Sequence, residues 1–167
     1  GGHSDQVTAM ALSADGKLLV TASLDKSIRV WDLAAAKQLV QIAGHAEKLL
    51  SVALSPDGKT VAAAGAGKVH SIKLWELATG KDIKEFPGHE GAVLSLAFSP
   101  NGQQLLSGGD DNLAKLWDVA TGNMVREIKG HTAAVNAVAF TPNSTQVVTG
   151  SADNSVRVWN VADATQV

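Results

Sequence analysis

The stretch GHTAAVNAVAFTPNSTQVVTGSADNSVRVWN, residues 130–160, contains the features that decide the fold. It opens with a Gly-His pair, ends near a Trp, and places apolar runs and turn-forming residues between them. The same layout occurs three more times along the chain, and the four histidines are His3, His45, His89 and His131. Because these histidines are 42, 44 and 42 residues apart, the chain consists of four units of about 42 residues.

Each unit is predicted to form four short strands. In the first unit the expected strands are Val7–Leu12, about Leu18–Ser23, Ile28–Asp32 and about Gln38–Ile42. The dipeptide Asp15-Gly16 separates the first two strands, and it favours a tight hairpin turn because both residues can adopt a positive φ. No helical periodicity appears, so the sequence predicts an all-β protein.

The first strand of each unit is apolar on both faces. In the fourth unit its apolar anchors are Val135, Val138 and Phe140, a spacing of three and then two. Since a regular strand alternates by two, we expect a β-bulge after the first anchor. The intervening Ala137 and Ala139 are also apolar, so both faces should be buried, as in small sheets stacked face to face.

With four such units in register, the chain resembles the WD-repeat (Trp-Asp repeat) family of β-propellers. Trp31-Asp32 and Trp117-Asp118 match the family pattern fully, whereas Trp75-Glu76 and Trp159-Asn160 are variants of it. The resemblance implies four blades per chain, each a four-stranded antiparallel sheet. The expected blades are residues 2–43, 44–87, 88–129 and 130–167, the last with an incomplete fourth strand.

The resemblance also implies a hydrogen-bonded tetrad of His, Ser or Thr, Asp and Trp in each blade. The matching residues are His3, Ser23, Asp25 and Trp31 in blade one, and His131, Ser151, Asp153 and Trp159 in blade four. Blade three keeps His89, Asp111 and Trp117 but has Gly109 at the expected hydroxyl position, and blade two keeps only His45 and Trp75. A polar network that recurs with the repeat period is expected to hold the fold together.

Blade two is therefore expected to be the weakest. Val69 stands at its Asp position, and two extra residues lengthen the turn at 65–71, which we expect to be mobile. His70 in this turn is expected to be solvated. The Gly-Ala-Gly at 65–67 lacks the flanking motif of a phosphate-binding loop, so we interpret it as turn chemistry.

Three kinds of chemical site are alternatives to this structural interpretation. Ser, His and Asp could form a hydrolytic triad, but four equivalent triads, one per repeat, would be unusual. Histidines 42 residues apart fall in different blades, which disfavours a metal site. The candidates for paired glycosidase carboxylates are Asp15, Asp32, Asp57 and Asp118. Their positions favour turn formation or strand termination, so we expect no catalytic residue, metal or cofactor.

Composition limits the possible partners of the 167-residue chain. Its net charge is −2 and no basic stripe exists, so neither nucleic acid nor an anionic membrane surface is an expected partner. No apolar run approaches the roughly 20 residues of a membrane span. The chain contains no Cys, which excludes disulfides and thiolate metal sites.

Function is therefore expected on exposed loops around the channel. In the family, partner contacts gather on the face that bears the Gly-His loops, and the resemblance transfers them to Gln6, Thr8, Leu24, Lys48, Leu50, Leu94, Asp110 and Asn136. We expect a protein or peptide partner and a non-catalytic interaction scaffold. The alternative is an accessory or regulatory module of a longer parent protein, enzymatic or not.

Four blades are too few to close a ring. Two half-rings would close one of eight blades, with blade four of each chain stacked on blade one of the other. The sequence therefore predicts a homodimer. The competing expectation is that the chain is half of a longer one, and the two expectations are compatible.

Overall fold

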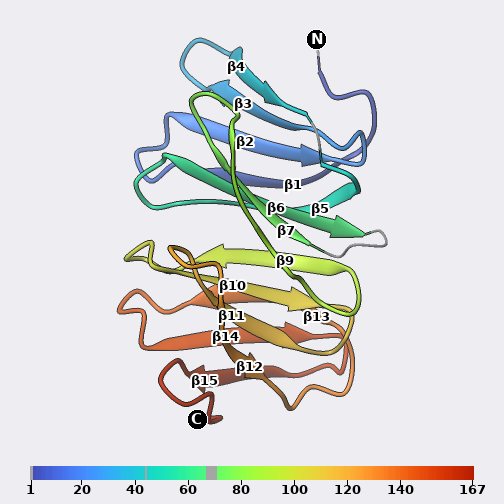
Figure 1. The fold of residues 1–167 in the computed structure, drawn as a ribbon, viewed down its shortest axis with the longest axis vertical. Coiled ribbons are helices and arrows are strands. Elements are labelled where there is room, and N and C mark those ends of the chain that lie inside the picture. Colours follow the sequence, from blue (N-terminus) through green and yellow to red (C-terminus); the bar gives the residue numbers. More distant parts are fainter. Residues whose placement is uncertain (1, 44, 67–70) are drawn as a thin grey trace.

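The computed structural model describes residues 2–43, 45–66 and 71–167, which form four sheets and no helix (Figure 1). Sheet 1 contains β1 (Val7–Leu12), β2 (Leu18–Ser23), β3 (Ile28–Asp32) and β4 (Lys37–Ile42). Sheet 2 contains β5 (Lys48–Leu54), β6 (Thr60–Ala66), β7 (Ile72–Glu76) and β8 (Asp82–Phe86). Sheet 3 contains β9 (Val93–Phe98), β10 (Gln104–Gly109), β11 (Ala114–Asp118) and β12 (Met124–Ile128). Sheet 4 contains β13 (Val135–Phe140), β14 (Gln146–Ser151) and β15 (Val156–Asn160).

Every sheet is an antiparallel meander in which consecutive strands are neighbours. The predicted bulge in the first strand is confirmed: the register shifts between Val7 and Ala9 in sheet 1, and between Val135 and Ala137 in sheet 4. The predicted hairpin between the first two strands is confirmed, but its geometry differs from the expected one. Gly16 has a φ of 68° and its N–H donates to the Ser13 carbonyl over 2.9 Å, whereas Asp15 does not adopt a positive φ. The sequence pattern thus locates both the hairpins and the bulges of the sheets.

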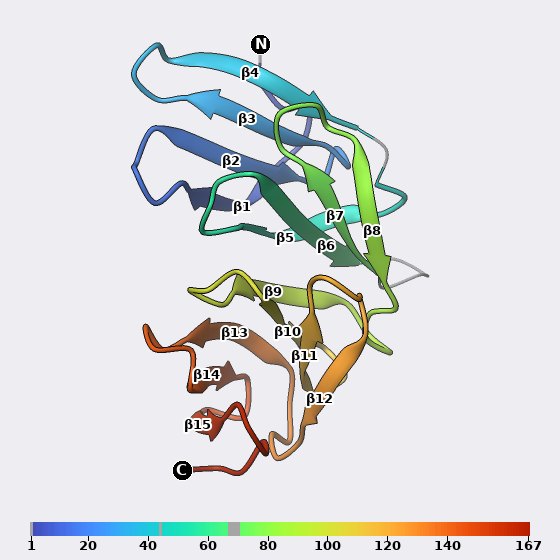
Figure 2. The same ribbon diagram turned by 60° about the vertical axis from the view of Figure 1, so that its left-hand side comes forward.

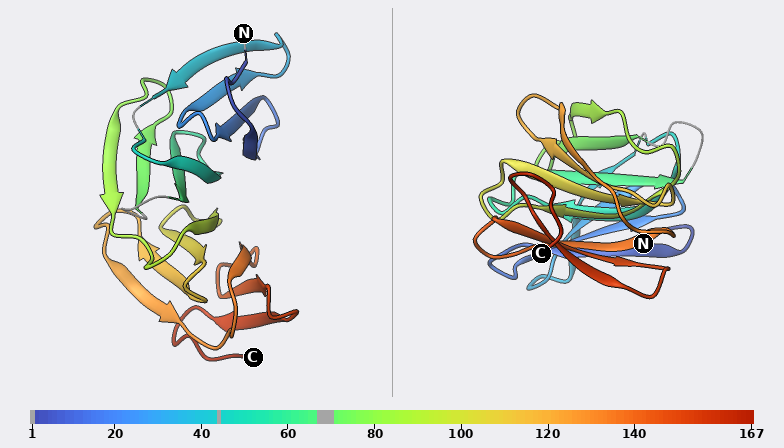
Figure 3. Two further views of the ribbon diagram at one scale, coloured as in Figure 1. Left: turned by 90° about the vertical axis from the view of Figure 1, so that its right-hand side faces the viewer. Right: turned by 90° about the horizontal axis from the view of Figure 1, so that it is seen from below.

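The sheets stack face to face and form an open crescent, with the first strand of each sheet on its inner side (Figures 2 and 3). We call the face of a sheet that carries its Trp the front face, and the opposite face the back face. Three apolar clusters join successive sheets. In the second cluster, Phe86 from the back face of sheet 2 packs against Trp117 from the front face of sheet 3, with ring centroids 5.9 Å apart.

The tryptophans of sheets 2 to 4 are buried in these clusters. They are Trp75, Trp117 and Trp159. Trp31 occupies the same position in sheet 1 but is only partly buried, because no sheet of the described residues packs against the front face of sheet 1. Burial of apolar surface between sheets is the main source of stability in a structure whose individual sheets have little core of their own.

Sheet 4 has three strands among the described residues. Beyond β15 the chain begins to pair with it, through an isolated bridge between Trp159 and Gln166 and a hydrogen bond from Val167 N–H to the Val158 carbonyl. The described part of the chain contains no helix long and apolar enough to cross a membrane.

Candidate functional site

The four histidines lie at one end of the sheets, which we call the histidine end. At this end the segment before the first strand lies beside the turn between the second and third strands of the same sheet. In sheet 1, Ser4 N–H donates to Asp25 in that turn over 2.9 Å. Neighbouring sheets are linked here too, because Lys26 Nζ donates to the Ala46 carbonyl over 3.0 Å.

In sheet 1 the histidine is the centre of a chain of hydrogen bonds. His3 Nδ1 lies 2.9 Å from Asp25 Oδ2, and His3 Nε2 lies 2.8 Å from Thr21 Oγ1. Trp31 Nε1–H donates to the same Thr21 oxygen over 2.9 Å. This arrangement fixes the tautomer, since Nδ1–H must donate to the carboxylate and Nε2 must accept the hydroxyl proton.

The hydroxyl of this network is that of Thr21, and its assignment to Ser23 was wrong. Trp31 pairs with Leu19 across the sheet, so its indole reaches the residue two positions further along β2, not four. Ser23 Oγ instead donates to the Asp5 carbonyl over 3.1 Å and accepts from Asp25 N–H. Ser23 therefore braces the loop without touching the histidine.

Sheet 4 needs the same correction. Thr149 Oγ1, and not Ser151, lies 2.7 Å from His131 Nε2 and accepts from Trp159 Nε1–H over 2.8 Å. His131 Nδ1 lies 2.8 Å from Asp153 Oδ2. Ser151 Oγ donates to a loop carbonyl over 2.9 Å, as its counterpart in sheet 1 does.

Sheet 3 carries a full network, so the inference that Gly109 leaves it without a hydroxyl was also wrong. Ser107 Oγ lies 2.7 Å from His89 Nε2 and accepts from Trp117 Nε1–H over 2.9 Å, while His89 Nδ1 lies 2.8 Å from Asp111 Oδ1. The signal that would have found it is spacing: the three network hydroxyls each stand ten residues before their Trp. Gly109 has a packing role, since a Cβ there would lie 2.4 Å from His89 Nδ1.

The electrostatics of the networks follow from burial and these bonds. Burial of His89 disfavours its cation and lowers its pKa, and the hydrogen bond to Asp111 opposes this shift only in part. Burial of Asp111 would raise the pKa of its carboxyl, but the hydrogen bond from His89 and the backbone N–H donors outweigh it and lower the pKa. Burial of Asp25 is outweighed in the same way, first by the hydroxyl of Ser27 and then by Ser4 N–H and His3, which hold its pKa far below its usual value.

Among the described residues, sheet 2 has no such network. Ala63 occupies the hydroxyl position, because it pairs with Lys73 as Thr21 pairs with Arg29. His45 Nδ1 accepts from Glu47 N–H over 3.1 Å, and among the described residues its Nε2 has no hydrogen-bond partner. Burial lowers the pKa of His45.

Four predictions on the turn of sheet 2 fall outside the described residues in whole or in part. They concern Val69 at the Asp position, a solvated His70, the Gly-Ala-Gly at 65–67 and the mobility of 65–71. Within that range Gly65 is described, and a Cβ there would lie 1.8 Å from the Lys48 carbonyl oxygen, so only glycine allows this close approach.

The hydroxyls that could act as nucleophiles are buried. Ser107 and Thr149 have no exposed surface, and Thr21 has 8%. Each hydroxyl also accepts an indole N–H and donates its proton to a histidine Nε2, so its proton and one lone pair are already used within the sheet. These hydroxyl, histidine and carboxylate chains have the order of a hydrolytic triad, but a substrate has no path to them.

The candidate glycosidase carboxylates are used within their turns. Asp15 accepts from Ser13 Oγ over 2.6 Å and from Lys17 N–H over 3.0 Å, and Asp57 makes the equivalent bonds. The serine hydroxyl bonds lower the pKa of both carboxyls, whereas a general acid needs a raised pKa. Asp32 and Asp118 accept from backbone N–H groups three residues later. Within residues 2–43, 45–66 and 71–167, no three His, Asp or Glu side chains gather closely enough to hold a metal ion.

The predicted rim residues differ in exposure. Gln6, Lys48, Asp110 and Asn136 are exposed, and Thr8, Leu24, Leu50 and Leu94 are half-buried. Thr8 has a structural role, because its Oγ1 lies 2.8 Å from the Leu49 carbonyl of the next sheet. Whether the others contact a partner stays a prediction.

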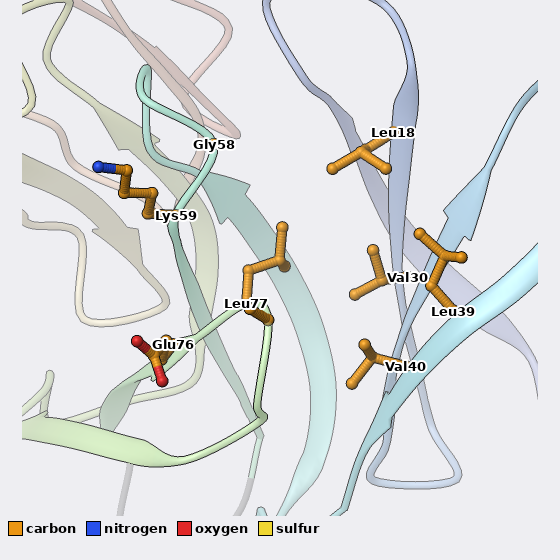
Figure 4. A pocket seen from close by; sticks show the side chains of 9 residues that line it. Leu18, Val30, Leu39, Val40, Gly58, Lys59, Glu76 and Leu77 are labelled. Carbon is orange, nitrogen blue, oxygen red and sulfur yellow. The ribbon is translucent and has the colours of Figure 1, made fainter.

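A pocket of about 480 Å³ opens between sheets 1 and 2, away from the histidine end (Figure 4). Leu18, Val30 and Val40 of sheet 1 face Leu77 of sheet 2 across it, and Lys59 and Glu76 border it. At the equivalent place between sheets 2 and 3, Lys84 replaces Val40 and donates from Nζ to the Ala120 carbonyl. The pocket contains none of the predicted rim residues.

Comparison with known proteins gives one consistent result. A family model described as "WD domain, G-beta repeat" matches residues 1–32, 36–76, 80–118 and 122–160. After the first, each matched segment begins just before the fourth strand of one sheet and ends with the third strand of the next.

Individual proteins match less of the chain or extend well beyond it. The solved structure of U3-55K superposes on the whole chain with a TM-score of 0.89 and 30% identity, and this chain covers 52% of it. Mitochondrial division protein 1 of Phaeosphaeria nodorum is 48% identical over 42 residues, 25% of this chain and 6% of that protein. WD repeat-containing protein 18 of Rattus norvegicus is 45% identical over 40 residues, 24% of this chain and 9% of that protein.

Proposed function

Since the chain belongs to the WD domain, G-beta repeat family, whose propellers generally serve as protein-interaction scaffolds, we propose that it is a non-catalytic scaffold that binds a protein or peptide at its histidine end. The observation that carries this proposal is that the histidines, hydroxyls and carboxylates of the networks are hydrogen-bonded to one another inside the sheets. In sheets 1, 3 and 4 both ring nitrogens of each histidine are hydrogen-bonded, which leaves the exposed rim as the surface available for recognition.

The binding surface on the rim combines apolar and polar contacts. Leu50 and Leu94 are half-buried on the first strands of adjacent sheets, and the exposed Lys48 and Asp110 lie at the same end. Half-buried leucines flanked by single charges of opposite sign suit a peptide with an apolar anchor residue and few charges.

Selection of a displayed random-peptide library on the immobilised chain tests this proposal. Enriched peptides should bind the unmodified chain and lose at least tenfold in affinity for Leu94→Arg. They should keep their affinity for Leu39→Arg, the same change at a more exposed leucine on the outer strand β4. Equal affinity for both variants would contradict a binding surface at the histidine end.

A second function is that of an accessory module. The chain covers only 6% and 9% of the two sequence relatives, so its repeats also occur within much longer proteins. Sequencing the complete reading frame tests this candidate directly, since an adjoining catalytic domain would support it and a reading frame limited to the four repeats would oppose it.

We also propose that two copies of the chain form one eight-bladed ring. The open crescent and the match to about half of the U3-55K chain support it (Figure 3). In such a ring the rim residues of both chains would surround one channel.

A further inference from the structure

We propose that the front face of sheet 1 and the back face of sheet 4 are the two halves of one sheet-to-sheet interface, completed by a second copy of this chain. The inference rests on the ring proposed above, and it names the contact that closes the ring. Among the described residues, these are the two sheet faces of the crescent without a neighbouring sheet (Figure 3). Each copy would supply one face to each of two identical contacts.

The front face of sheet 1 is apolar and exposed. Met10 is 74% exposed and Leu12 is 60% exposed, and they lie beside Val7, Leu19, Trp31 and Leu33. The equivalent residues of sheet 4, which has sheet 3 in front of it, are Val135, Val138, Phe140, Val147, Trp159 and Val161. All six of these belong to or pack against an apolar cluster, so the residue types on sheet 1 suit contact with a sheet in front of it.

The cation on this face does not prevent such a contact. Arg29 of sheet 1 stands two residues before Trp31, where sheet 3 has Lys115. Lys115 is buried inside the stack and lies 3.9 Å from Asp111 of its own network. A cation at this position is therefore already accommodated between two sheets of the chain.

The back face of sheet 4 has the complementary character. Val156 is 74% exposed, and Ala139, Val148, Gly150 and Val158 lie on the same face. Their counterparts in sheet 1, which include Val20, Ala22 and Ile28, are fully or almost fully buried against sheet 2. Neither open face carries a row of charges that would mark it as a solvated end of the stack.

Gly150 lies where a larger side chain would test whether the two faces are in contact. Its counterpart in sheet 3 is Gly108, where a Cβ would lie 2.9 Å from Cγ1 of both Val135 and Val138 in the next sheet. At Gly150 a Cβ would meet only Ala137 Cβ, at an ordinary 3.7 Å. The repeat places Val7 and Met10 of the second copy over Gly150, because they are the counterparts of Val135 and Val138.

A second copy is the occupant that these observations favour. Both halves of the interface are on the same chain, and each repeats a half that is already paired within it. A front-to-back contact between sheets of this size should bury on the order of 1,000–2,000 Å², and a two-chain ring contains two such contacts, enough for a stable dimer. If the rotation did not close at two copies, the same contact would generate longer assemblies.

The first experiment measures mass by light scattering at micromolar concentration. The unmodified chain should have twice the 17.2 kDa of one copy. Met10→Lys and Val156→Glu should each be monomeric, and an equimolar mixture should recover a dimer, because one of its two interfaces is then unmodified. A monomeric unmodified chain, or masses that grow with concentration, would overturn the inference. A dimer that survives Val156→Glu would also overturn it, since that result fits sheet 1 pairing with sheet 1.

The second experiment tests the fit at Gly150. A Cβ at position 150 has room within one chain. The branched side chain of Gly150→Val should clash with the second copy, so this variant should raise the dimer dissociation constant at least tenfold. The control is Ala120→Val, at an exposed turn away from both faces. Trp31 emission should shift to longer wavelength in the monomeric variants, and Trp31→Phe should abolish that shift. A dimeric Gly150→Val would contradict the close contact proposed at Gly150. The light-scattering experiment tests the two-chain ring separately. Peptide binding at the rim is measured independently of both experiments.

Discussion

Sheets 2 and 3 are neighbours with similar backbones, but they differ in the hydrogen bonds made by their buried histidine. In sheet 3, His89 is joined on both ring nitrogens to Asp111 and Ser107, and Ser107 also accepts the indole N–H of Trp117. In sheet 2, Ala63 takes the place of the hydroxyl, and His45 keeps one bond to a backbone N–H. Both sheets nevertheless bury their tryptophan almost completely. The comparison shows that stacking suffices to form a sheet, whereas the polar network fastens the loop before a sheet to the turn beyond its second strand.

The largest effect is expected from removing a tryptophan. Trp117→Ala should lower the free energy of unfolding by about 3–5 kcal/mol, because it opens a cavity between two sheets and leaves Ser107 without its indole donor. Trp75→Ala opens a similar cavity in a sheet without that hydroxyl, so its cost should be smaller. Urea unfolding of the two variants measures the difference, and a larger cost for Trp75→Ala would contradict the comparison.

The next effect concerns the carboxylate of sheet 3. Asp111→Ala should cost about 1–3 kcal/mol, because it leaves His89 Nδ1 and the Glu90 N–H without an acceptor. The adjacent Asp110 is exposed, and Asp110→Ala should cost less than about 0.5 kcal/mol. Thermal melts that ranked Asp110→Ala as the more damaging change would show that the network contributes little.

A gain of stability is expected in sheet 2. Ala63→Ser would place a hydroxyl where sheet 3 has Ser107, within the site that faces His45 and Trp75. The new bond should add about 0.5–1.5 kcal/mol to the free energy of unfolding. The control is Ala62→Ser, which puts the same hydroxyl on the apolar back face of sheet 2 and should destabilise the chain. Equal effects of the two changes in urea unfolding would argue against the missing hydroxyl as the difference between the sheets.

The smallest effect is expected from pH. Both His45 and His89 have pKa values lowered by burial from their ordinary 6.5, so the unfolded chain binds protons more readily than the folded one. Stability should therefore be complete above pH 6.5 and should fall as the pH decreases below it. Since Asp111 opposes the shift at His89, Asp111→Asn should steepen this loss between pH 7 and 5. A slope that stayed the same in calorimetry across that range would place the titration elsewhere.

The strands, the turns and the bulges could be predicted because each depends on short-range patterns. Asp15-Gly16 specifies a hairpin, and the spacing of Val135, Val138 and Phe140 specifies a bulge. The hydroxyl of the network could not be placed in this way. Ser23 and Thr21 are both on the front face of β2, and only the register with Trp31 decides which one the indole reaches. The same ambiguity of position applies to Ser107 and Gly109. The sequence therefore predicts a network without a hydroxyl in sheet 3, whereas Ser107 completes it.

The matched segments of the chain run from the fourth strand of one sheet through the third strand of the next, so the unit of sequence and the unit of structure are out of phase. Each sequence unit therefore contributes strands to two successive sheets. Duplication or loss of one whole unit in a gene leaves every remaining sheet with its number of strands unchanged, because each unit supplies the fourth strand of the preceding sheet and receives its own fourth strand from the next unit. A gene built this way can lengthen or shorten by single repeats, and only the sheets that flank the change acquire a new neighbour.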